Sequence, residues 1–172
     1  MSKKEYNFVR CEIYPDDEQK KIINQTLAYK RFVYNRMLAD EQKEYEKSGK
    51  CIIPPYSTYK PLLADTKGVD NVALNNVWWS VRADLNRFFA KKSGFPVKKR
   101  KSDQVQYYKT INNNGCMHIE KQRVKLPKLK WVHFNKPISI PANTSIEFAI
   151  ISRNNKNQYF VNLAFKSTST TT

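Results

Sequence analysis

Five side chains suited to nucleic-acid contact recur at three- and four-residue intervals in one stretch of the sequence: Asn71, Asn75, Trp79, Arg82 and Asn86. Residues at these intervals share one face of an α-helix. An amide can pair with the edge of a base, bidentately with adenine in a major groove, while an indole can stack and a guanidinium can bind phosphate. We expect this face to bind DNA, with a solvated polar helix face as the alternative for Asn71 and Asn75.

Four consecutive cations follow the predicted helix. Gly94 and Pro96 end that helix, because one is flexible and the other lacks a backbone donor. The cations, which we call the strap, are Lys98, Lys99, Arg100 and Lys101. A cluster this short is often a solvated face or a linker. The aromatic residues Tyr107 and Tyr108 downstream favour contact with nucleic-acid phosphates instead.

The helices that position these residues are predicted from apolar spacing. The buried face of the helix that begins after Asp70, its expected cap, comprises Leu74, Val77, Val81, Leu85 and Phe88. Upstream, residues 4–14 alternate as a strand, and a helix from about Glu18 to about Lys47 carries a wide apolar stripe. Residues 56–65 predict a short helix interrupted near Pro61, in which Tyr56 can pack or stack on a base.

Downstream of the strap, the periodicity changes to that of short strands. They are expected at 105–111, 117–119, 123–126, 131–134, 146–151 and 159–165. The order of elements predicts an α+β fold, a β-barrel with a helical bundle inserted after its first strand. We assign 1–14 and 93–166 to the barrel, 15–92 to the helical insertion, and 167–172 to a disordered tail.

Composition favours a polyanionic partner. The 172-residue chain has 31 Lys and Arg against 15 Asp and Glu, a formal net charge of +16. Nucleic acid is the expected partner, and an acidic membrane surface is the main competitor. No apolar run approaches the roughly 20 residues that span a bilayer, and the N-terminus lacks a signal-peptide core. We therefore expect a soluble, cytoplasmic, nucleoid-associated protein with no membrane partner.

The sequence does not predict catalysis or metal binding. Its three cysteines, Cys11, Cys51 and Cys116, are far apart, and the two histidines complete no ligand spacing. We find no phosphate-binding glycine loop and no nucleophile–base arrangement. The acidic residues concentrate at helix ends, where capping and solvation explain them. We expect no enzyme activity, no metal site and no cofactor in this chain.

Several short motifs occur in an order that resembles a known family. They are Glu12-x-Tyr14-Pro15 with Gln19, Arg31-Phe32-Val33-Tyr34-Asn35, Val69-Asp70 with Ala73-Leu74, Asn86 to Phe89, Gly94-Phe95-Pro96, and Leu126-Pro127-Lys128-Leu129-x-Trp131-Val132. Together they resemble the N-terminal half of TnpB, the transposon-encoded OrfB proteins related to compact type V CRISPR nucleases. The resemblance covers residues 5 to 165.

The resemblance implies a wedge domain, an oligonucleotide-binding-like barrel, interrupted by a helical recognition domain. These domains would bind a guide RNA and read a short motif in double-stranded DNA, while base pairing supplies most of the specificity. By position, the residues facing the DNA motif would be Tyr56, Asn71, Asn75 and Thr110, beside Trp79 and Arg82 of the predicted face. RNA or duplex backbone would be contacted by Lys98, Lys99, Arg100, Lys101, Lys109, Lys125, Lys128 and Lys130.

The chain also departs from the family pattern. The family's RuvC-like nuclease half has no counterpart in this sequence, so Mg²⁺ is expected only with a separately supplied half. Lys130 stands where the family usually has glycine. The expected function is an RNA- and DNA-binding module that does not cleave alone. The alternatives are a guide-free DNA-binding repressor, a helix-turn-helix transposase accessory protein, and one half of a split nuclease.

Overall fold

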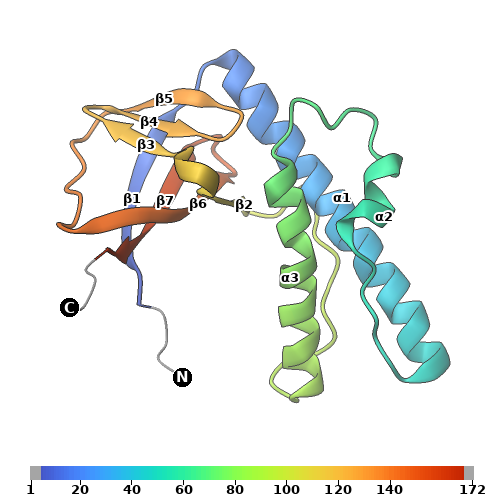
Figure 1. Ribbon diagram of the computed structural model, residues 1–172. Helices are drawn as coiled ribbons and strands as arrows, with labels where there is room; N and C mark the ends of the chain where they lie inside the picture. The colour runs from blue at the N-terminus through green and yellow to red at the C-terminus, as the bar shows by residue number, and fades with distance from the viewer. Residues whose placement is uncertain (1–4, 169–172) are drawn as a thin grey trace. The chain divides into compact units, whose positions relative to one another are not determined.

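The computed structural model describes residues 5–168 and confirms the expected α+β fold. The chain divides into two compact units. One contains the residues up to 23 and those from 104 onward, and the other contains residues 24–103. The first unit holds the strands, which come from both ends of the sequence, and the second holds most of the helical residues (Figure 1).

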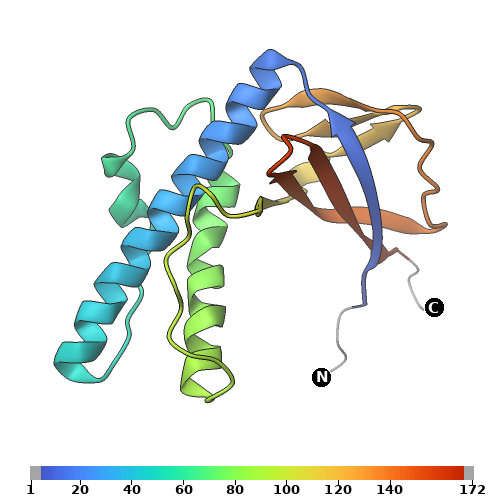
Figure 2. The same cartoon turned by 180° about the vertical axis from the view of Figure 1, so that it is seen from behind.

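Within the described residues, the strand unit is one antiparallel sheet of seven strands in the order β2-β6-β7-β1-β5-β4-β3. Their bounds are β1 (Asn7–Tyr14), β2 (Val105–Ile111), β3 (His118–Glu120), β4 (Arg123–Leu126), β5 (Lys130–Phe134), β6 (Thr144–Asn154) and β7 (Tyr159–Ser167). A short 3₁₀ helix, η2 (Asn113–Gly115), connects β2 to β3. The sheet is strongly curved, with β3, β4 and β5 folded over towards β6 (Figures 1 and 2).

The strand register separates an inner from an outer side of this sheet. Tyr108, Ile151 and Val161 lie opposite one another on three neighbouring strands and are completely buried. Successive side chains of a strand point to opposite faces. Lys109 follows Tyr108, and Arg10 pairs with Asn162, the residue after Val161, so both belong to the outer side. The sheet therefore has an apolar inner face and an outer face that carries cations.

The helical unit is built from three helices and one further 3₁₀ turn. They are α1 (Asp17–Ser48), α2 (Tyr56–Tyr59), η1 (Lys60–Leu62) and α3 (Asn71–Phe89). Their shared core contains the buried residues Val33, Tyr34, Met37, Leu38, Tyr56, Tyr59, Val69, Leu74, Val77, Val81 and Leu85. The apolar stripes predicted from the sequence thus form the core of this unit.

The ends of the long helices are fixed as their sequences predict. Asp16 and Gln19 form a reciprocal capping box at α1: Gln19 N donates to Asp16 Oδ1 at 2.8 Å, and Asp16 N donates to Gln19 Oε1 at 2.9 Å. Gly49 ends the helix at a φ of 71°, a conformation that favours glycine. Asp70 caps α3 by accepting from Ala73 N at 3.1 Å.

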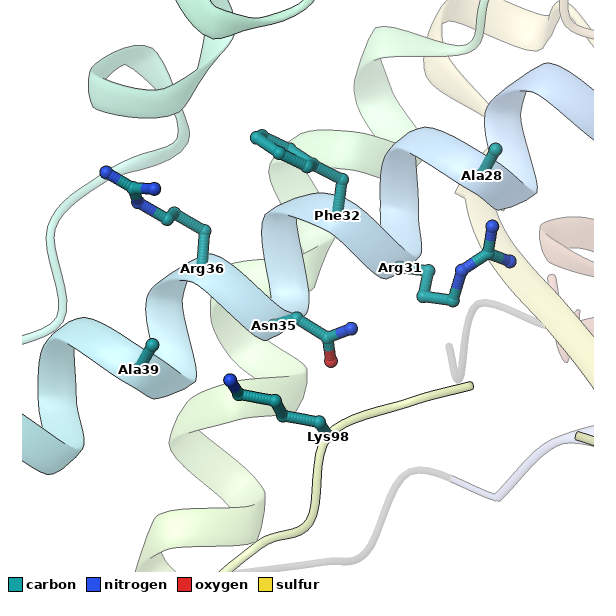
Figure 3. Close-up of a pocket in the computed structure, with 7 residues that line it drawn as sticks. All are labelled: Ala28, Arg31, Phe32, Asn35, Arg36, Ala39 and Lys98. Carbon is teal, nitrogen blue, oxygen red and sulfur yellow. The ribbon is translucent and has the colours of Figure 1, made fainter. Parts of the chain in front are cut away.

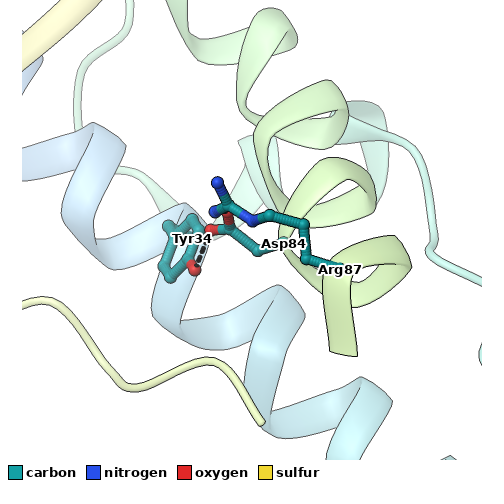
Figure 4. Close-up of polar contacts among 3 residues, drawn as sticks. All are labelled: Tyr34, Asp84 and Arg87. Atoms are coloured by element: carbon teal, nitrogen blue, oxygen red, sulfur yellow. Dashed lines mark hydrogen bonds and ion pairs between the residues drawn. The ribbon is translucent and has the colours of Figure 1, made fainter. Parts of the chain in front are cut away.

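A buried tyrosine joins α1 to α3. The Tyr34 hydroxyl donates to Asp84 Oδ2 at 2.6 Å, and Arg87 forms an ion pair with the other oxygen of the same carboxylate (Figure 4). Tyr59 makes a similar bond to Asp40 of α1, at 2.8 Å. These carboxylates therefore hold the helices together, and burial combined with the bond to Asp40 raises the pKa of Tyr59.

The structure divides the chain at other places than the sequence suggested. Residues 15–23, which we assigned to the helical insertion, belong to the strand unit, because Gln19 bonds to the turn before β5. Residues 93–103, which we assigned to the barrel, belong to the helical unit. Ser167 pairs with Thr144 in the sheet rather than starting a tail, and residues 169–172 lie outside the described residues. The short helix α2 ends at Tyr59, before Pro61.

Gln19 offers a direct test of how α1 is attached to the sheet. Its Nε2 donates to Leu129 O and to Trp131 O, both at 2.8 Å. We predict that Gln19→Ala lowers the free energy of unfolding by about 2 kcal/mol, since two carbonyls lose their donor. Gln19→Glu keeps an acceptor for the capping box but removes that donor, and should destabilise the protein at least as much. Urea unfolding measures both, with exposed Lys20→Ala as the control; equal midpoints for all variants would contradict the prediction.

Candidate nucleic-acid interface

The outer face of α3 carries most of the predicted DNA-binding residues at the surface. Asn75, Trp79, Arg82 and Asn86 are all exposed, and Trp79 retains 59% of its accessible surface. The opposite face of the same helix is buried against the core. The structure therefore places these four side chains together and open to solvent.

Two indoles and a guanidinium form an ordered cluster on α3. Trp78 is fixed because its Nε1 donates to Ile53 O at 3.0 Å. The rings of Trp78 and Trp79 meet edge to face, with centroids 4.8 Å apart. The Arg82 guanidinium carbon lies 5.3 Å from one ring centroid and 5.6 Å from the other. A cation and an exposed stacking surface are thus held side by side.

Asn71 differs from the other residues of the face, because its amide already has partners. It accepts a hydrogen bond from the Tyr56 hydroxyl at 3.0 Å and donates to Thr66 O at 2.7 Å. Tyr56 itself is 5% exposed, and burial raises the pKa of its hydroxyl. In this arrangement the pair supports the start of α3, so Asn75 is the first asparagine of the face that is open to a base.

The strap is held against α1 by one side chain. Asn35 Nδ2 donates to Lys99 O at 2.9 Å, and Lys99 N donates to Asn35 Oδ1 at 2.7 Å. Arg100 N donates to Asp103 Oδ2 at 2.9 Å, which fixes the turn that follows. All four strap side chains are nevertheless exposed. The backbone is therefore ordered while the charges face solvent.

Lys30 is a partly buried cation that lies near Lys99 of the strap. Lys99 Nζ lies 5.0 Å from the centroid of the Tyr34 ring. Burial, together with the nearby charge of Lys99, lowers the pKa of Lys30 from 10.5 to about 8, and Asp84 opposes this shift. An added phosphate would relieve this repulsion, because an opposite charge favours the protonated lysine.

The outer side of β2, β6, β7 and β1 combines cations with aromatic rings. Lys109 Nζ lies 4.0 Å from the Phe148 ring centroid, and the Arg10 guanidinium lies 4.5 Å from that of Phe160. Phe8 packs edge to face on Phe148 and is 53% exposed. The predicted site residue Lys109 therefore belongs to a larger cation–aromatic surface.

The remaining predicted lysines lie on β4 and on the turn into β5. Lys125 is exposed and pairs across the strands with Trp131, whose ring lies 4.4 Å from the Arg123 guanidinium. Lys128 and Lys130 are exposed in the turn, at positive φ angles of 66° and 59°. All three are open to solvent in the strand unit.

Thr110 does not reach the surface. Its side chain lies on the inner side of β2 and is 0% exposed, and its hydroxyl has no hydrogen-bond partner. The family position suggested a contact with DNA, but the strand register turns this residue towards the core. In the described conformation Thr110 is an interior residue.

Sequence reasoning missed several residues of these surfaces. Asn35 was noticed only as part of a motif, and its position on the helix edge gave no sign that it holds the strap. Phe148 reaches Lys109 through the pairing of β6 with β2, and Arg10 of β1 joins the same side of the sheet through β7. A pattern within one strand carries no signal for such a neighbour.

Across residues 5–168, no helix combines the length and the apolar character needed to cross a membrane. In that part of the chain no three His, Cys, Asp or Glu side chains are grouped so that they could hold a metal ion. The three cysteines are free and half-buried. Burial raises the pKa of the Cys11 thiol to about 11, so it is protonated at neutral pH.

The lowered pKa of Lys30 predicts a characteristic pH dependence. Between about 8 and 10.5 the unfolded chain binds this proton and the native protein does not, so the free energy of unfolding rises with pH. Lys30→Met should therefore stabilise the protein below pH 8, by up to about 3 kcal/mol, and this gain should shrink towards pH 10.5. Urea unfolding across this range measures the difference, with exposed Lys20→Met as the control. A gain independent of pH would refute the assignment.

Comparison with known proteins identifies the first part of the chain. Residues 4–50 match the family model HTH_OrfB_IS605, described as a helix-turn-helix domain. No curated protein matches the chain. The described part of the match contains one strand, β1, and one long helix, α1. It also contains two of the motifs noted above, Glu12-x-Tyr14-Pro15 and Arg31-Phe32-Val33-Tyr34-Asn35. The match supports the resemblance over this region: residues 4–50 are similar to the helix-turn-helix domain of the OrfB family.

Proposed function

We propose that this chain is the nucleic-acid-binding module of a TnpB-like protein, which binds a guide-like RNA and a short motif in duplex DNA. The observation that carries the proposal is the strap, whose backbone is fixed by Asn35 while its four cationic side chains remain exposed. Such an arrangement contacts phosphates without ordering a flexible segment first. The family match supports a DNA-binding role in transposition.

The DNA-reading part of the proposal rests on α3. Asn75, Trp79 and Arg82 are exposed on one face and lie within two helical turns. Asn75 supplies a donor and an acceptor for a base edge, and Arg82 supplies a cation for the adjacent backbone. Asn71 and Tyr56 stabilise the start of this helix instead of facing a base.

The RNA-binding part of the proposal combines the strap with the strand unit. We assign the curved sheet to an oligonucleotide-binding-like barrel, supported by its antiparallel order and by the cations on its outer side. Lys109, Lys125, Lys128 and Lys130 would contact backbone phosphates.

Cleavage is assigned to a separately supplied nuclease half, together with the Mg²⁺ that such a half would use. The carboxylates of this chain support that division, because many of them have structural roles. Asp16 and Asp70 cap helices, Asp84 binds Tyr34 and Arg87, and Asp40 accepts from Tyr59.

A guide-free repressor of the helix-turn-helix type is the competing function. The described part of the family match contains a single helix, α1, whose apolar stripe is buried in the core. A recognition helix would have to be α3, without the short helix-to-helix turn that defines the motif. This arrangement of helices favours the proposed module over a repressor that inserts a single recognition helix.

Two experiments, on the co-purifying RNA and on the strap, test the RNA-binding part of the proposed function. The tagged protein, purified from its native host after a high-salt wash, should retain one enriched structured RNA, identified by sequencing. Changing Lys98, Lys99, Arg100 and Lys101 together to alanine should weaken that binding and reduce its log–log salt slope by about 3.

The control changes four exposed lysines elsewhere: Lys20, Lys50, Lys60 and Lys156. It removes the same charge and should leave the slope closer to that of the unchanged protein. An identical slope in both variants would show that only net charge matters. Random RNA, or none, would instead favour a guide-free DNA binder.

Asn75→Ala tests the DNA-reading part. Loss of a bidentate amide contact should relax preference at one base position, by about 1–3 kcal/mol, with a smaller effect on overall affinity. Selection from a randomised duplex library, followed by affinity measurement, gives both quantities. Exposed Asn155→Ala is the matched control. A uniform loss of affinity across sequences would argue against base reading by Asn75.

A further inference from the structure

An open groove runs along the surface of α1, inside the helical unit. It has a volume of about 520 Å³ and is lined by Ala28, Arg31, Phe32, Asn35, Arg36, Ala39 and Lys98. The six residues from α1 recur at one-, three- and four-residue intervals, so they form one stripe along the helix. Figure 3 shows the Phe32 ring and the Lys98 chain on either side of Asn35, with Arg31 and Arg36 extending in opposite directions.

This stripe lies apart from the face of α1 that packs in the core. Val33 and Met37 are 0% exposed, whereas Phe32, about 100° from Val33 around the helix axis, is 41% exposed. An aromatic ring left this open costs hydrophobic free energy unless a partner covers it. Ala28 and Ala39, at the two ends, are small enough to leave space beside the ring.

The groove is cationic as well as aromatic. Its lining includes three cations, Arg31, Arg36 and Lys98, and no carboxylate. Its shape depends on the strap, because the Asn35 side chain that lines the groove also holds Lys99 in place. Arg31 and Arg36 are five residues apart, about 8 Å along the helix axis.

We propose that this groove binds an unpaired segment of a nucleic-acid strand. One base stacks on Phe32, and the flanking phosphates bind Arg31, Arg36 and Lys98. The inference deepens the proposed function and rests on it, since it names the form of nucleic acid that one surface accepts. A duplex does not fit this role, because its bases are paired and stacked and offer no free face to the ring. A protein partner is disfavoured by the net charge of +16 and by a lining that contains three cations and no carboxylate.

The test uses the full chain and a fluorescent oligouridylate of about ten nucleotides that contains 5-iodouridine. Binding is measured by anisotropy, and irradiation crosslinks the modified base to the ring it contacts. Oligodeoxythymidylate of the same length distinguishes an RNA from a DNA strand as the source. A duplex DNA and the RNA that co-purifies with the protein are measured in parallel.

Phe32 variants separate stacking from simple apolar contact. Phe32→Leu keeps an apolar side chain without a π face and should weaken oligonucleotide binding about tenfold. Phe32→Trp restores a stacking surface and should bind about as tightly as the unchanged protein. Because the ring is substantially exposed, both variants should fold, which circular dichroism checks.

Charge variants test the phosphate contacts. Arg36→Gln with Lys98→Gln should reduce the log–log salt slope by about 1. The control pair, Lys20→Gln with Lys60→Gln, removes two exposed cations outside the groove and should leave the slope unchanged. The crosslinked peptide should contain Phe32.

The outcomes distinguish this inference from the proposed function. Equal binding by Phe32→Leu and the unchanged protein, or a crosslink outside the groove, would overturn the groove assignment. If the protein binds duplex DNA or its own RNA but not the short strands, the groove assignment fails and the proposed function stands. If it binds no nucleic acid at all, both fail.

Discussion

Two hydrogen bonds from one amide determine how the charged surface of the helical unit is presented. Asn35 pairs with both the N–H and the carbonyl of Lys99, as a neighbouring strand would, and so fixes an otherwise irregular segment. Ordering a free segment costs about 1–2 kcal/mol per residue, and here that cost is met on folding rather than on binding. The same amide also lines the α1 groove, so the strap and the groove depend on a single side chain.

Like charges are kept close together in both units by placing them over aromatic rings. Arg82 lies beside Trp78, Lys109 over Phe148 and Arg123 over Trp131. A ring stabilises a cation without cancelling its charge, whereas a carboxylate would neutralise it. Arg123 also forms an ion pair with Glu120 at 2.6 Å, so its charge is partly offset. Burial, with a smaller contribution from the charge of Lys99, lowers the pKa of Lys30.

Local chemistry explains which features were predictable from the sequence. The long helices follow from apolar spacing and from caps such as Asp16 and Asp70, whose partners are three residues away. Thr110 was assigned to a DNA contact by family position, but the strand register buries it. Asn71 was assigned by helix spacing and by family position, but its amide oxygen accepts a hydrogen bond from the Tyr56 hydroxyl. The boundaries between the two units also differ from the predicted ones, because the hydrogen bonds of Gln19 and Asn35 join residues far apart in the chain. The spacing of residues in the sequence does not predict contacts that depend on tertiary structure.

The turn between β4 and β5 connects backbone geometry with charge. Lys128 and Lys130 both adopt left-handed backbone angles, which cost a residue with a side chain roughly 1–2 kcal/mol and cost glycine almost nothing. A glycine at the position of Lys130, as the resemblance implies, would adopt this conformation at almost no cost. In this chain a strained turn carries two exposed cations instead. At Lys130 the conformational cost of a side chain and the exposure of a cation therefore come together in one residue.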